Sequence, residues 1–155
     1  MKRRITLTVL IALTVALVSL PIFGVDSFSG KVKSVKDGDT IVISNKGEWV
    51  TVNLAGIHTP TRGQEFGEEA RDYLTEIAKK KAATVEVTQH SVRGHGSSIR
   101  YVAFVTVDGR DLSTAMIEAG YAWPTSAAGK SQLAAAEKAK ASKSGVYSES
   151  FEAGS

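Results

Sequence analysis

The sequence predicts an α+β fold built on a small β-barrel, and three observations lead to this prediction. Five segments alternate apolar and polar residues, as half-buried strands do. A segment with helical spacing lies between the third and the fourth of them, and two more helical segments follow the fifth. The chain of 155 residues is long enough for one domain with a single hydrophobic core, which we place at residues 28–148.

Turn-forming residues separate the strands. Asp37-Gly38 favours a tight hairpin because glycine readily takes a positive φ, and Asp39 is expected just past this turn, at the rim of the sheet. Similar turns are expected at 45–47 and 108–109. The expected strands are 28–40, 41–44, 48–55, 84–89 and 100–107.

The helices are expected at 68–81, 111–119 and 133–141. The first has Glu68 and Glu69 at its start and three lysines at its end, which suits the helix dipole. Gly120 is placed to end the second. Five strands with a helix between the third and the fourth is the order of a closed barrel of the oligonucleotide-binding (OB) type, so the full prediction is a five-stranded OB-fold-type barrel plus three helices.

The N-terminal segment has the sequence pattern of a targeting signal. Three basic residues at 2–4 precede an apolar run at 5–23, so residues 1–27 are expected to be a signal peptide. A retained membrane anchor is the alternative, because ~20 apolar residues cross a bilayer. Either reading places the domain outside the cytoplasm, secreted or anchored, with membrane contact only through an uncleaved segment. Residues 149–155 are expected to be a tail.

Composition limits the chemistry. The chain has 19 basic and 16 acidic residues, and without the three basic residues of the leader the two signs balance. Charge therefore gives no general drive toward nucleic acid, although a local basic patch can still bind it. The chain has no cysteine, which excludes disulfides and thiolate metal sites.

Polar residues collect where the strands end. Asp39 follows the first hairpin turn, and the third strand ends in a glycine-containing bend that leads to Thr59. Carboxylates that converge at strand ends commonly hold hard cations, and such cations often assist phosphate chemistry. Trp49, within the third strand, is expected to pack in the barrel.

The motifs VKDGDT, LAGIHTP, QEFGEEARDYL, RYVAFVTVDGRDLSTAMIEAGYA and AEKAKASKSGVYS occur in this order between residues 30 and 148. Together they resemble the staphylococcal-nuclease-like (thermonuclease) family. The resemblance implies an OB-type barrel with three helices and a calcium-dependent phosphodiesterase that acts on DNA and RNA. Asp39 matches the first calcium-ligating aspartate and Asp37 a supporting aspartate. Thr59 matches the threonine that offers its backbone carbonyl to the metal, and Arg100 matches the arginine that contacts the scissile phosphate.

Several positions depart from the family pattern, and for the function these departures matter more than the matches. Asn53 stands where the family has a catalytic arginine, His58 where it has a second metal-binding aspartate, and Thr61 where it has the glutamate that activates water. The usual Tyr-Gly before Arg100 reads Ser98-Ile99. Loss of a general base typically removes ~10²–10⁴-fold in rate, and loss of one charge-stabilising donor ~10²–10³-fold. Calcium, expected for the family, should bind weakly or not at all, because it prefers several oxygen ligands.

Three hypotheses follow. The first is an exported, catalytically impaired or inactive member that acts as a binding module for single-stranded nucleic acid or for another extracytoplasmic protein. The second is an active nuclease that uses Asp39, Arg100 and Glu65, with Arg62 nearby, in rearranged roles. The third is a transition-metal site around His58, because imidazole nitrogen suits zinc, copper or nickel.

Arg100, Lys79 and Trp123 are the candidate nucleic-acid contacts, through charge and stacking. Each also has a plainer interpretation. Arg100 can pair with a neighbouring carboxylate, of which Asp39 is the obvious one. Lys79 can complement the helix dipole, and Trp123 can pack at the rim of the core. His95 is a further possible ligand of a transition metal, and its simplest place is in a loop.

Overall fold

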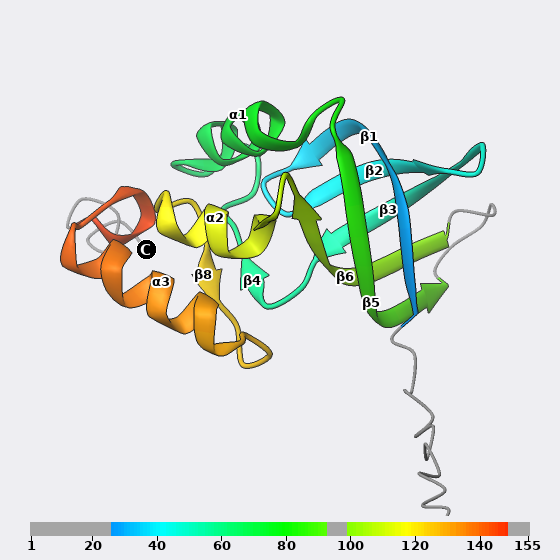
Figure 1. Cartoon of the computed structure of the whole chain (residues 1–155). Helices are drawn as coiled ribbons and strands as arrows, with labels where there is room; N and C mark the ends of the chain where they lie inside the picture. The colour runs from blue at the N-terminus through cyan, green and yellow to red at the C-terminus, as the bar shows by residue number, and fades with distance from the viewer. Residues whose placement is uncertain (1–25, 93–98, 149–155) are drawn as a thin grey trace, which may run out of the picture.

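Five long strands form a closed barrel in the computed structural model, which describes residues 26–92 and 99–148 (Figure 1). The sheet order is β3-β2-β1-β5-β6-β7, and a parallel pairing of β3 with β6 closes the barrel. The strands are β1 (Ser27–Asp37), β2 (Thr40–Asn45), β3 (Glu48–Leu54), β5 (Ala82–Val92), β6 (Ile99–Val107) and the short β7 (Arg110–Asp111).

Three helices accompany the barrel and lie together at one end of it (Figure 1). They are α1 (Gly67–Ala78), α2 (Leu112–Glu118) and α3 (Lys130–Ala141), followed by a 3-10 turn at Gly145–Tyr147. A two-residue strand β4 (Ile57–His58) pairs with β8 (Trp123–Pro124) between barrel and helices. The prediction of a five-stranded OB-type barrel with three helices is confirmed.

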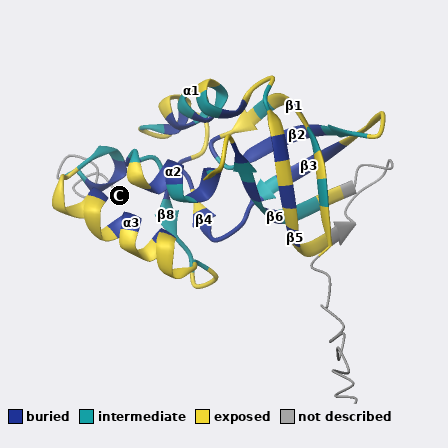
Figure 2. Ribbon diagram, viewed as in Figure 1, coloured by how far each residue is buried: buried dark blue, intermediate teal, exposed yellow. Residues whose placement is uncertain are grey.

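The alternation that predicted the strands also builds the core. Val32, Ile41, Val52, Val85 and Val105 are fully buried inside the barrel, while their strand neighbours point outward. Figure 2 shows the buried residues along the strands, on α2 and on the inner face of α3. The helices contribute the fully buried side chains of Leu74, Leu112, Met116 and Ile117.

The first hairpin differs from the prediction. Asp37 pairs with Thr40, so the turn consists of Gly38 and Asp39, and Asp39 lies in the turn and not after it. Gly38 does not have a positive φ. It is buried, and a Cβ added there would lie 2.8 Å from Ala70 Cβ and 3.0 Å from Thr59 Oγ1. Glycine is therefore required here for close packing of the hairpin against α1.

Three further sequence expectations need correction. Trp49 is 72% exposed and does not pack in the barrel. His58, which falls in none of the expected strands, belongs to β4; the sequence does not reveal this strand because two residues are too few to show strand periodicity. The first helix ends at Ala78, and Lys79 is its C-cap, so only Glu68 and Glu69 lie within a terminal turn.

The end of β3 is fastened to the helices through one carbonyl oxygen. Ser113 Oγ of α2 donates to Ala55 O at 2.9 Å, and Gln132 Nε2 of α3 donates to the same oxygen at 3.2 Å. Both side chains are buried, with at most 1% exposed. Tyr147 further anchors the C-terminal part by donating to Ala122 O at 2.9 Å, and burial raises the pKa of Tyr147 to about 12.

The predicted leader (residues 1–25 of it) and the tail lie outside the described residues. Within the described part of the chain, no helix has the length and apolar character needed to cross a membrane.

Candidate functional site

The turn that carries Asp39 is fixed to the neighbouring strand. The Thr40 hydroxyl donates to Asp39 Oδ1 at 2.8 Å, which orients the half-buried carboxylate. The Asp39 carbonyl accepts a hydrogen bond from the Leu54 N–H at 2.8 Å, which ties the hairpin to the end of β3. The carboxylate therefore has a defined place beside β3.

Asn53 and Arg100 share the outer face of the sheet with this turn. Asn53 is paired with Thr40 on one side and with Val102 on the other, and Thr51 is paired with Arg100. Because alternate residues of a strand point to the same face, Arg100 lies on the face of Asn53, one alternation away. Arg100 is exposed, and no ion pair among the described residues joins it to Asp39.

His58 is held by an aromatic contact. It is paired with Trp123 across β4 and β8, and the two ring centroids are 6.2 Å apart in a stacked arrangement with an interplanar angle of 28°. Within residues 26–92 and 99–148, no three His, Cys, Asp or Glu side chains gather as metal ligands would. His95 lies outside the described residues.

The two threonines after β4 play structural parts. Thr59 is only 3% exposed and lies against Gly38. Thr61 is exposed, and both its N–H and its hydroxyl donate to Gln64 Oε1, at 2.7 Å and 3.0 Å. Thr61 thus forms the first part of the turn that leads into α1.

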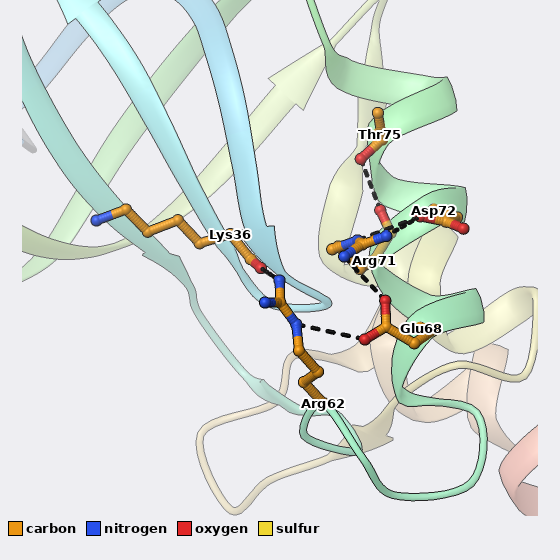
Figure 3. Close-up of polar contacts among 6 residues, drawn as sticks. All are labelled: Lys36, Arg62, Glu68, Arg71, Asp72 and Thr75. Atoms are coloured by element: carbon orange, nitrogen blue, oxygen red, sulfur yellow. Dashed lines mark hydrogen bonds and ion pairs between the residues drawn. The ribbon is translucent and has the colours of Figure 1, made fainter.

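An ionic network holds this loop against the hairpin (Figure 3). Arg62 donates to Lys36 O of β1 at 3.4 Å and pairs with Glu68 at 3.3 Å, while Arg71 pairs with the same Glu68 at 2.8 Å. The pKa of Arg71 is raised, chiefly by its hydrogen bond to Asp72, with smaller attractions from Glu68 and Asp37. Arg71 is not among the site residues predicted from the sequence, although its spacing from Glu68 is that of an ion pair on a helix.

The remaining candidates are dispersed. Glu65 is exposed in the same loop. Ala70, near the start of α1, lies against Gly38, whereas Lys79 follows nine residues later, which is ~13 Å along a helix. Trp123 is half-buried beside His58. The structure therefore brings Asp39, Asn53 and Arg100 to one face and sets Lys79 apart.

The residues at the hairpin fit calcium poorly. Calcium takes six to eight oxygen ligands, with carboxylates prominent among them. Asp39 offers one half-buried carboxylate that already accepts a hydrogen bond from Thr40, and His58 offers nitrogen that is stacked on an indole.

The fold and the site together define a small OB-type barrel that carries an acidic hairpin turn, an arginine on the adjoining outer face and three helices. The chain belongs to the family described as staphylococcal nuclease homologue, whose sequence profile matches residues 51–149.

The chain is also similar to several curated proteins. The chain is 30% identical over 118 residues to a micrococcal nuclease of Shigella flexneri, a match that covers 72% of this chain and 66% of the relative. It is 30% identical over 137 residues to an uncharacterized protein of Bacillus anthracis, covering 81% and 63%. An uncharacterized endonuclease of Escherichia coli O157:H7 is 29% identical over 113 residues, covering 73% and 71%. The first two matches thus span about two thirds of those relatives.

Proposed function

We propose that this protein is an exported nucleic-acid-binding barrel whose ability to hydrolyse phosphodiester bonds is impaired or absent. Family membership supports a nucleic acid as the ligand. The residues at the family's catalytic positions support the loss of hydrolysis. A binding module of this kind keeps the barrel and its outer basic groups and needs no activated water.

The observation that carries this proposal is the local engagement of the substituted positions. Thr61 stands where the resemblance places the general base, and its polar groups are occupied by Gln64. A threonine hydroxyl also cannot accept a proton at neutral pH. His58 stands at a metal-ligand position, and its ring stacks on Trp123. Asn53 carries no charge to stabilise a transition state.

The neighbouring charged residues Arg62 and Glu65 do not replace the missing catalytic base and arginine. Arg62 is engaged by Glu68 and by a carbonyl of β1, so its guanidinium is held in the loop. Among the described residues, Glu65 is exposed and forms no ion pair that would hold its carboxylate in place, whereas catalysis requires a positioned base within hydrogen-bond reach of the attacking water. Arg100, by contrast, is exposed on the face of Asn53 and forms no ion pair with a carboxylate among the described residues. It is free to meet a phosphate.

We expect the purified full chain to bind a short single-stranded oligonucleotide and to leave it intact in the presence of calcium. Binding should weaken linearly with the logarithm of salt concentration, because phosphate contacts release counterions. Arg100→Ala should lower the magnitude of this salt slope by about 1. Fluorescence anisotropy measures the binding, and gel electrophoresis measures the integrity of the substrate.

The matched control is Arg110→Ala, because Arg110 is an exposed arginine on β7 that is already neutralised by Glu118 at 2.8 Å. Its loss should leave the salt slope unchanged. Calcium-dependent degradation that disappears in Asp39→Ala would contradict the proposal and favour an active nuclease. A chain that shows no salt-dependent binding would contradict the nucleic-acid part and favour a protein partner.

The export part of the proposal rests on the basic residues at 2–4 and the apolar run at 5–23. In a bacterial host, the full chain should be found outside the cytoplasm, and a variant without residues 1–27 should stay inside. Cell fractionation with antibody detection measures the difference. Equal cytoplasmic amounts of both chains would rule out the leader as an export signal.

A further inference from the structure

The β2–β3 hairpin carries Trp49, whose indole is not part of the hydrophobic core. Trp49 is 72% exposed, and among the described residues only Leu133 of α3, at 50%, is another large hydrophobic side chain classed as exposed. Exposure of this extent leaves a large apolar surface of the tryptophan in water, which is unfavourable by roughly 25 cal/mol for each Å². An indole of this kind is well suited to a ligand with a flat aromatic face.

Strand register places Trp49 on the face that carries Asn53 and Arg100. Trp49, Thr51 and Asn53 alternate along β3, whose pairing with β2 is continuous, so they point to the same side. Arg100 is paired with Thr51 on the neighbouring strand. Trp49 is therefore one alternation from Arg100, and it lies ~13 Å along the strand from Asn53.

The surroundings of Trp49 are mostly cationic. Ser44 pairs with Trp49 on one side and with Lys31 on the other, so Lys31 lies in the same cross-strand row. Lys46 is exposed in the turn, and Glu48 is the one carboxylate in this hairpin. Among the described residues neither lysine forms an ion pair. Lys31, Lys46 and Arg100 thus surround the indole with positive charge.

We propose that Trp49 is a stacking platform for a base of single-stranded nucleic acid whose phosphates follow Lys31, Lys46 and Arg100. This inference rests on the proposed nucleic-acid binding and assigns it a surface. The combination of an aromatic face and flanking cations is what sequence-tolerant single-strand binding requires, because every base has a π-face and every linkage a phosphate. The ~13 Å between Trp49 and Asn53 corresponds to about four nucleotides at a stacked spacing of ~3.4 Å.

Trp49→Ala should weaken the binding of a fluorescein-labelled oligothymidylate by about 5- to 150-fold, which corresponds to ~1–3 kcal/mol for one stacked base. The measurement uses the full chain in EDTA, so that hydrolysis does not interfere. Trp49→Phe should retain part of the affinity, because a smaller ring still stacks. Tryptophan fluorescence should be quenched on binding in the parent chain and much less in Trp49→Phe, which keeps only Trp123.

The matched control is Leu133→Ala, which removes the other exposed large hydrophobic side chain and should leave the affinity unchanged. If the parent chain binds the oligonucleotide and Trp49→Ala binds it equally well, the platform is wrong while the proposed function stands. If the parent chain does not bind the oligonucleotide, both the Trp49 platform and the proposed nucleic-acid binding are wrong. If Trp49→Ala weakens retention on anionic phospholipid vesicles but does not change oligonucleotide binding, the patch binds a membrane surface instead. The parent chain and Trp49→Ala carry the same N-terminal segment, so membrane binding by that segment does not affect the comparison.

Discussion

The triple substitution Asn53→Arg, His58→Asp and Thr61→Glu should give the protein calcium-dependent cleavage of single-stranded DNA, at least ~10³-fold above the parent chain. A positioned base is worth ~10²–10⁴-fold and a charge-stabilising donor ~10²–10³-fold, and because such effects are not additive the combined gain is not their product. The added carboxylate at position 58 would also join Asp39 as a calcium ligand. Release of acid-soluble nucleotides, with calcium and with EDTA, measures the gain.

Stability should be checked first, because His58→Asp removes the stacking contact with Trp123, which contributes ~0.5–1.5 kcal/mol. Adding Asp39→Ala to the triple substitution should abolish the new activity while the fold remains. The triple variant can be folded, by circular dichroism and thermal melting, and still leave DNA intact with calcium present. In that case, the three substitutions do not account for the loss of hydrolysis, and that part of the proposal is wrong.

The fold was predictable because its signals are local. Alternation places Val32, Ile41 and Val52 inside the barrel, and residue pairs such as Lys46-Gly47 and Asp108-Gly109 adopt the positive φ that hairpin turns require. Closure of the barrel is different. It depends on the parallel pairing of β3 with β6, two strands far apart in the sequence, and no local pattern encodes that contact.

The candidate site was less predictable for physical reasons. The place of Asp39 follows from the hairpin, but the stacking of His58 on Trp123 requires β4 and β8, each too short to show a period. Trp49 was expected to be buried because tryptophan is apolar and lies in a strand. Its row on the outer face, fixed by the pairing with Ser44, leaves it exposed instead.

Gly56→Ala should destabilise the fold by ~2–5 kcal/mol. Gly56 has φ +76°, a conformation that costs an L-residue ~1–2 kcal/mol. Its added Cβ would also press on the Gln132 amide, which is 3.0 Å away at Nε2 and even closer at Oε1. Moving this buried amide breaks its hydrogen bonds to Ala55 O and from Gly129 N, at ~1–3 kcal/mol for a buried group left without a partner. The melting temperature should fall by on the order of 10 °C.

Gly47→Ala separates the two causes of this loss. Gly47 has φ +90°, and an added Cβ there meets nothing within 4 Å, so this variant carries backbone strain alone and should lose only ~1–2 kcal/mol. Combining Gly56→Ala with Gln132→Ala should cost less than the sum of the two single changes, because the shortened side chain vacates the space. If Gly56→Ala melts no lower than Gly47→Ala, the contact with Gln132 does not constrain the β3–β4 turn, and the placement of Asn53 and His58 on either side of it must depend on the strand pairings instead.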